Sequence, residues 1–179
     1  YLDGNNASVV SSDGNKTTVQ MGSGYRGDLW LARSGKGKIV NVTPADYRYF
    51  AIKVGFKSQL VPGKNKPNGC IKLEIFDDGI KKIGPEYFGT GGDANNRYEI
   101  LGASEISTTE PNVLYYDLQS KYKTVTPTDW NQVFDLSQCK FVIADFPETA
   151  QTYDLYWIRS FKSIEELQAF VDSENNTNE

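Results

Sequence analysis

The stretch TYDLYWIRSFKSIEELQAFV, residues 152–171, decides the fold because strand-forming aromatic and branched residues pass directly into a helical pattern. In its second half, Ser163 precedes Glu166 by three positions, which is the spacing of a capping box at a helix N-terminus. Apolar residues then recur at helical spacing, at Ile164, Leu167, Phe170 and Val171. The stretch predicts a strand followed by an amphipathic helix that lies against a sheet.

Trp157 stands between Tyr156 and Ile158, just before the predicted helix. A large aromatic ring at this point contributes most when it is buried, so we expect Trp157 to anchor the helix to the sheet. With this helix included, residues 1–173 are predicted to form a single domain. Residues 174–179 are predicted to be a polar tail or a linker to another domain.

Upstream of this stretch, short strand-like segments alternate with turn-forming residues. About ten segments rich in branched or aromatic residues are bounded by Gly, Pro, Asn or Asp, among them GDLWLARS (27–34), YRYFAIKVGF (47–56) and CIKLEIFDD (70–78). No stretch before residue 160 has helical periodicity. The regular spacing of these segments predicts an all-β sandwich or barrel with one C-terminal helix.

Composition excludes several classes of function. The chain has 19 basic and 23 acidic residues and no basic stripe, so nucleic acid is not expected as a partner. No apolar run reaches the roughly 18 residues of a membrane span, and no signal peptide pattern is present, so any export signal or lipid anchor is expected to have been removed. The chain has no histidine, which excludes triads that need an imidazole.

The two cysteines and two turn-like segments give no cofactor prediction. Cys70 and Cys139 lie far apart and outside any CxxC or zinc-ligand spacing, so they are either two buried thiols, which we favour, or one disulfide. The segments DDG at 77–79 and GGD at 91–93 offer oxygen ligands for a structural calcium ion. Neither has the full spacing of an EF-hand loop, and both fit turns better.

Strand alternation separates core residues from outward ones, because successive side chains point to opposite faces of a sheet. In 27–34, Leu29 and Leu31 are assigned to the core, which leaves Trp30 outward with Asp28 and Ala32. In 47–56 and 70–78 the same rule assigns these residues to the core: Phe50, Ile52, Val54, Phe56, Ile71, Leu73 and Ile75. It assigns these to the outside: Tyr49, Ala51, Lys53, Lys72, Glu74 and Phe76. The outward sets could together form one polar and aromatic surface.

An outward tryptophan among polar residues is typical of a sugar site, because a pyranose has an apolar C–H face and a rim of hydroxyls. Trp30 is the first candidate, with Tyr25, Arg26 and Arg33 beside it in sequence. The further candidates are Trp130, flanked by Asp129, Asn131 and Gln132, and the tyrosines around the glycine-rich loop, Tyr87 and Tyr98. The competing interpretation is that a loop or the terminal helix covers the outward ring.

Three segments together resemble a known family. They are YRYFAIKV (47–54), FVIADF (141–146) and 152–171, in which Trp157 begins a Trp-Ile-Arg-Ser-Phe run. This pattern is similar to a domain family of unknown function from Bacteroidetes cell-surface proteins, except that Tyr-Arg-Tyr stands where a proline after the tyrosine is expected. The resemblance implies a jelly-roll β-sandwich similar to galactose-binding-like carbohydrate-binding modules.

The resemblance also implies a function. It suggests a non-catalytic, monomeric module that binds a polysaccharide or oligosaccharide, with a xylan-like plant glycan as one ligand. The module would be covalently linked to other domains of a secreted or surface protein with an outer-membrane anchor. Two alternatives stay open: a small jelly-roll glycoside hydrolase that uses Glu74, since that chemistry needs only two carboxylates, and a spacer or protein-interaction domain.

Overall fold

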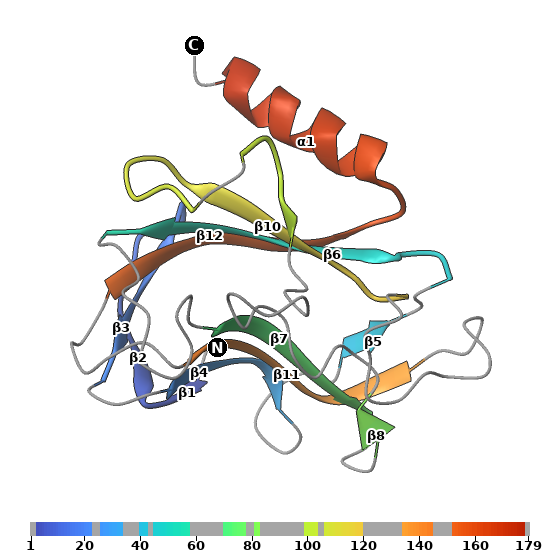
Figure 1. The fold of residues 1–179 in the computed structure, drawn as a ribbon. Helices are drawn as coiled ribbons and strands as arrows, with labels where there is room; N and C mark the ends of the chain where they lie inside the picture. The colour runs from blue at the N-terminus through green and yellow to red at the C-terminus, as the bar shows by residue number, and fades with distance from the viewer. Residues whose placement is uncertain are drawn as a thin grey trace.

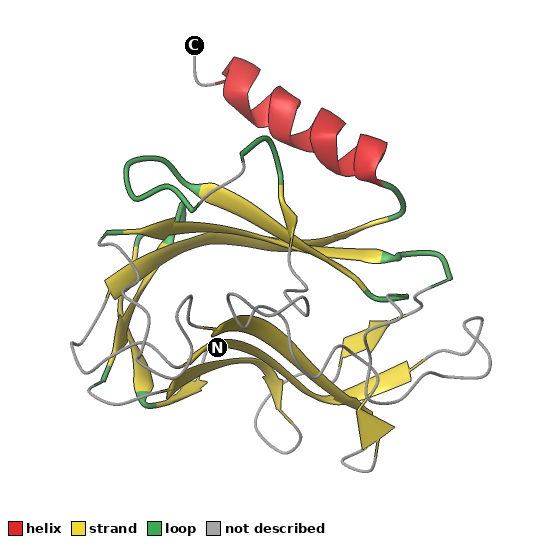
Figure 2. Cartoon of the chain, in the orientation of Figure 1, coloured by secondary structure: helices red, strands yellow, loops and turns green. Residues whose placement is uncertain are grey.

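The computed structural model describes residues 3–22, 26–33, 40–42, 45–57, 70–77, 81–82, 99–103, 106–119, 134–144 and 152–177. Within these residues there are twelve strands and one helix, and the strands form two antiparallel six-stranded sheets. Figure 1 shows the sheets as two stacked layers with the helix on the outer side of one of them. Strands dominate the described part of the chain in Figure 2, which confirms the all-β prediction with one C-terminal helix.

The first sheet, sheet A, has the strand order β1-β4-β11-β7-β8. The short strand β5 pairs with the first three residues of β11. Its strands are β1 (Asp3–Asn5), β4 (Arg26–Arg33), β5 (Val40–Val42), β7 (Cys70–Asp77), β8 (Lys81–Lys82) and β11 (Phe134–Ala144).

The second sheet, sheet B, has the order β2-β3-β12-β6-β10-β9. Its strands are β2 (Ala7–Ser12), β3 (Thr17–Met21), β6 (Tyr49–Phe56), β9 (Glu99–Ile100), β10 (Asn112–Asp117) and β12 (Thr152–Phe161). The helix α1 (Ile164–Thr177) follows β12 and crosses the outer face of this sheet.

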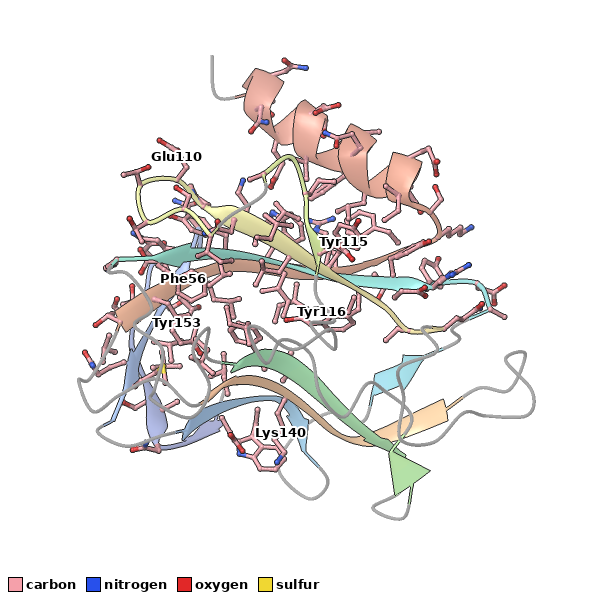
Figure 3. All side chains as sticks on the ribbon, viewed as in Figure 1. Phe56, Glu110, Tyr115, Tyr116, Lys140 and Tyr153 are labelled. Atoms are coloured by element: carbon pink, nitrogen blue, oxygen red, sulfur yellow. The ribbon has the colours of Figure 1, made fainter. Side chains whose placement is uncertain are left out.

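The main core fills the space between the two sheets. Tyr153 of β12 contacts Phe141 of sheet A edge to face at 5.9 Å between ring centroids, and its ring centre lies 6.2 Å from that of Phe56. Figure 3 shows Tyr153, Phe56 and Tyr116 between the layers. The residues of β6 that were predicted to lie in the core all belong to this main core: Phe50, Ile52, Val54 and Phe56. Ile71 of β7 belongs to it too. The side chains of Leu73 and Ile75 lie outside the described residues.

The outward sets do not form one surface, which corrects the sequence prediction. The outward residues of β6, Ala51 and Lys53, lie on the outer face of sheet B, whereas Trp30 lies on the outer face of sheet A. The inner faces of the two sheets are turned toward each other, so their outer faces look in opposite directions (Figure 1). Alternation cannot reveal this because it does not say which strands share a sheet.

The junction of β12 and α1 follows the predicted cap. The backbone N–H of Glu166 donates to the Ser163 hydroxyl at 3.1 Å, and the Glu166 carboxylate accepts from the backbone N–H of Lys162 at 2.6 Å. The helix then continues to Thr177, through part of the segment interpreted as a polar tail. Glu174, in that extension, accepts hydrogen bonds from Lys53 and Trp157, which holds the last turns of the helix on the sheet.

The strand register separates the two cysteines. Cys70 is opposite Ala144 and Cys139 is opposite Ile75, so the cysteines are five positions apart along neighbouring strands. At about 3.3 Å per residue this is roughly 16 Å, whereas a disulfide needs Cα atoms within about 7 Å. The register therefore favours two separate thiols over a disulfide between Cys70 and Cys139.

Candidate functional site

Trp30 lies on the outer face of sheet A, as predicted from alternation. Its neighbour Leu29 is 1% exposed in the core, and Leu31 packs against the same core. Trp30 itself is half-buried, and its cross-strand partners are Asp3 on β1 and Lys140 on β11. The orientation of Trp30 is thus confirmed, while its role in binding stays a prediction.

A lysine holds the indole ring in place. The Nζ atom of Lys140 lies over the Trp30 ring, 4.7 Å from its centroid, which is a cation–π contact. Figure 3 shows Lys140 on the side of sheet A that faces away from sheet B. Because the Lys140 side chain is only 13% exposed, the contact is partly desolvated, which strengthens it.

The same lysine pairs with a buried carboxylate. The Lys140 Nζ atom is 3.3 Å from Oδ2 of Asp28, whose side chain is 4% exposed. Asp28 precedes Trp30 by two positions on β4, so both lie on the outer face. Asp28, Lys140 and Trp30 therefore form one connected unit, which we call the sheet A cluster.

A β-bulge affects where Arg33 falls. The register of β4 with β11 shifts at Leu31: Trp30 is opposite Lys140, but Ala32 is opposite Cys139 and Arg33 is opposite Gln138. Leu31 is therefore the extra residue of the bulge, and the pairing of β4 with β11 is offset by one residue after it. The side chain of Ala32 lies outside the described residues, so its predicted outward position stays a prediction.

The other predicted site residues are only partly placed. Arg26 begins β4, opposite Ala144, but the side chains of Arg26 and Arg33 are not among those described. The following predicted residues and segments lie outside the described residues: Tyr25, Tyr87, Tyr98, Trp130, 78–79 of the DDG segment and 91–93. Glu74, the residue of the hydrolase alternative, is described by its backbone alone, opposite Lys140 on β7.

The outer face of sheet B has a tryptophan too, and there α1 covers it. Trp157 contacts Phe161 and Phe170 edge to face, with ring centroids 6.2 and 5.3 Å apart. Its Nε1–H donates to Oε2 of Glu174 at 2.9 Å, and Leu167 beside it is fully buried. The prediction that Trp157 anchors the helix is confirmed.

Beside the helix, sheet B carries a group of residues that sequence reasoning missed. The register of β12 with β6 shifts at Tyr156, a bulge that leaves this residue without a cross-strand partner. The Tyr156 ring lies on Gly55: a Cβ added to Gly55 would be 3.4 Å from Cε2 and 3.7 Å from the hydroxyl oxygen. The signal in the sequence was Gly55, the single glycine in β6, because a glycine inside a strand often marks such a close approach.

Next to Tyr156, a buried carboxylate gathers three donors. Asp154 accepts from Lys16 at 2.8 Å and from the Thr18 hydroxyl at 2.7 Å, and Lys57 lies 3.3 Å away. Burial alone would raise the pKa of Asp154, but the bonds from Lys16, Thr18 and Lys57 outweigh it and lower the pKa below its ordinary value. The hydrogen bond that Lys16 donates to Asp154 also raises the pKa of Lys16.

The comparisons with known proteins show one family. The family model described as "Domain of unknown function (DUF4979)" matches residues 2–167, so the chain belongs to this family. Neither the curated proteins nor the solved structures contain a match to the chain. In the part of the chain that the structure describes, no helix has the length and apolar character needed to cross a membrane.

Proposed function

We propose that this DUF4979 domain is a non-catalytic carbohydrate-binding module that holds a polysaccharide on the outer face of sheet A. The observation that carries the proposal is the half-buried Trp30 ring, which Lys140 fixes on an outer sheet face beside Asp28. The xylan-like plant glycans are the first ligands to test. The binding set consists of Trp30, Arg26 and Arg33 on β4, with Tyr25, Trp130 and Tyr87 as its further members.

The chemistry of the sheet A cluster suits a sugar. An indole ring provides a flat apolar area for the C–H face of a pyranose, and a neighbouring ammonium can donate to its hydroxyls. The contact with Lys140 favours one placement of the Trp30 ring, which would reduce the side-chain entropy lost on binding. A fixed ring between charged groups is therefore a better platform than a ring that moves.

The jelly-roll assignment belongs to the proposal as well. Both sheets place strands far apart in sequence side by side, with β4 next to β11 and β3 next to β12. Such long connections between antiparallel strands are typical of Greek-key and jelly-roll sandwiches. This order supports a galactose-binding-like sandwich.

The setting follows from the resemblance of the sequence to Bacteroidetes surface domains. We propose a secreted or cell-surface location, as one monomeric module of a larger protein with an outer-membrane anchor and other glycan-binding or glycan-degrading domains. A single shallow platform would bind weakly, and neighbouring modules would raise the effective affinity by avidity. No cofactor is part of this proposal.

A glycoside hydrolase is the second candidate, because Glu74 stands opposite Lys140 in the same cross-strand row as Trp30. Hydrolysis needs two carboxyl groups about 5 to 9.5 Å apart. The described carboxylate of the cluster, Asp28, is buried and paired with Lys140, and its strand is separated from that of Glu74 by β11. Binding without cleavage is therefore the better-supported function.

Affinity electrophoresis tests the proposal. The wild-type domain, Trp30→Ala and Trp130→Ala are run through native gels that contain xylan, mannan, glucan or pectin, with Tyr47→Ala as the control. Tyr47 is an aromatic residue that is 42% exposed, and its ring contacts Lys162, between β12 and α1. We expect a polysaccharide to retard the wild type and Tyr47→Ala, and to retard Trp30→Ala clearly less, while the circular dichroism of Trp30→Ala stays that of the wild type.

Two other outcomes would contradict the proposal. Release of reducing ends that stops with Glu74→Gln would establish the hydrolase. Absence of retardation on every polymer would favour a spacer or protein-interaction domain and would remove Trp30 as a site.

A further inference from the structure

A hollow of about 450 Å³ lies on the outer face of sheet B, between α1 and the start of β10. Its apolar part is formed by Leu101, Val113 and Val171. Its polar rim carries Lys53, Glu110 and Asp172. Figure 3 shows Glu110 at the loop end of β10, on the helix side of sheet B. The volume is within the range of about 300 to 1,000 Å³ that small-molecule sites occupy.

Lys53 connects this hollow to an aromatic ring. The residue lines the hollow, and its Nζ atom also lies 5.9 Å from the centroid of the Tyr156 ring. The ammonium is held in that place by a 3.0 Å ion pair with Glu174. The hollow and the Tyr156 ring are therefore neighbouring parts of one surface, which we call the α1 hollow.

Two backbone features place Tyr156 on this surface. The bulge of β12 leaves Tyr156 out of the strand register, and bulges often re-aim a side chain next to a site. Gly55 of β6 is the cross-strand partner of Asp154. Because Gly55 has no side chain, the Tyr156 ring can pack directly against the backbone of β6. Tyr156 is only half-buried in this position. A strand without the bulge and the glycine would hold this ring differently.

The polar groups of the rim include both hydrogen-bond donors and hydrogen-bond acceptors. Glu110 and Asp172 supply acceptors, and the Lys53 ammonium supplies donors. Asp172 is held in turn by the Gln168 amide, which donates to it at 2.8 Å. Apolar lining residues, an adjoining aromatic ring, and hydrogen-bond donors and acceptors together match a sugar ring better than a simple ion.

We propose that the α1 hollow is a second saccharide-binding site, which takes a short stretch of the same class of polysaccharide as the sheet A cluster. The ligand class rests on the proposed function, but the site does not use Trp30. Tyr156 would stack on the apolar face of a pyranose, while Lys53, Glu110 and Asp172 would bind its hydroxyls.

A second site on the opposite outer face would make the domain bivalent. The two sites lie on sheets whose outer faces look in opposite directions, so one chain of sugar residues could not lie flat across both. One domain would then hold two polysaccharide strands, or two distant stretches of one strand. Binding to a polymer would be stronger than binding to an oligosaccharide by avidity.

Isothermal titration with xylohexaose, or with the hexasaccharide of whichever polymer retards the domain, tests the second site. We expect about two equivalents bound by the wild type, about one by Trp30→Ala, about one by Tyr156→Ala and none by the double variant. Gln168→Trp, a change of an exposed helix residue that fills the hollow, should also reduce the stoichiometry to about one.

The outcomes separate the two proposals. If Tyr156→Ala and Gln168→Trp keep the stoichiometry of the wild type while Trp30→Ala loses a site, the second site is refuted and the sheet A site stands. If Trp30→Ala keeps the wild-type stoichiometry while the other two lose a site, the α1 hollow stands and the proposed platform fails.

A spectrum of the unaltered protein avoids variants that fold poorly. In a domain labelled with ¹⁵N-glycine, xylohexaose should shift the amide signals of Gly102, which lines the hollow, and of Gly55, which lies against the Tyr156 ring, and leave Gly14 in place. Gly14 lies in the turn between β2 and β3 and serves as the internal control. Shifts that spare both Gly55 and Gly102 at saturation would refute the site.

Discussion

Trp30 and Trp157 both lie on the outer face of a sheet, yet the two rings have different surroundings. Trp157 lies under α1, where Phe161, Phe170 and Glu174 contact it. The Lys140 ammonium, which is itself paired with Asp28, lies over the face of the Trp30 ring.

The difference teaches that strand alternation assigns a face but does not say what covers it. At Trp157 the cover follows directly in sequence, since a capping box starts a helix two residues after the strand ends. At Trp30 the ring is held by Lys140, a residue more than a hundred positions away that the sheet brings into register. The same local pattern, an outward tryptophan on a strand, can therefore give a helix anchor such as Trp157 or a proposed binding platform such as Trp30.

The largest expected difference between the two rings is in stability. Trp157→Ala should lower the free energy of unfolding by about 3 kcal/mol, because it removes the ring contacts and the bond that hold α1. Trp30→Ala should cost about 1 kcal/mol, since no core packing is lost. Urea unfolding followed by circular dichroism measures both. Equal losses would mean that Trp30 is a structural residue like Trp157.

The next largest effect should come from the lysine that holds Trp30. Lys140→Met removes an ion-pair partner of the buried Asp28 carboxylate and should cost about 2 kcal/mol. Lys57→Met is the matched control, since Lys57 is 51% exposed at its side chain and should change stability by less than about 0.5 kcal/mol. If Asp28→Asn does not restore part of the stability of Lys140→Met, the pair does not act as described.

A smaller effect is the dependence of stability on pH, which we expect to come from Asp154 on sheet B. The pKa of Asp154 is lowered in the folded state, so its contribution to stability is present above the ordinary pKa of about 3.9 and is lost as pH falls through the lower folded value. Urea midpoints at pH 7 and pH 3 should differ less in Asp154→Asn than in the wild type. Asp46→Asn, at an exposed loop position, should keep the wild-type difference.

The smallest effect should come from Ser163, the N-cap of the helix α1 that covers Trp157. Ser163→Ala removes the hydroxyl that accepts from the Glu166 N–H, and such a loss costs about 1 kcal/mol. Ser173→Ala, inside the same helix, should be close to neutral. Thermal unfolding of the two variants gives the comparison. Equal melting temperatures would mean that packing alone fixes the start of α1.

Local patterns predicted the elements and their faces, because these depend on neighbours in sequence. The inward residues of β6, the capping box and the role of Trp157 are all of this kind. The pairing of Trp30 with Lys140 depends on which strands share a sheet, and that is fixed by the whole chain. Bulges at Leu31 and Tyr156 interrupt the alternation, and no local signal announces them except Gly55.

One measurement tests the central claim most directly, namely that Trp30 binds glycan while Trp157 anchors the helix. The domain is labelled with 5-fluorotryptophan, its three indole signals are assigned by single Trp→Phe variants, and the polysaccharide that retards the domain is titrated in by ¹⁹F NMR. In Tyr156→Ala, which lacks the second site, we predict that the Trp30 signal shifts and broadens while the Trp157 signal stays in place. A shift of the Trp157 signal with an unchanged Trp30 signal would contradict the account.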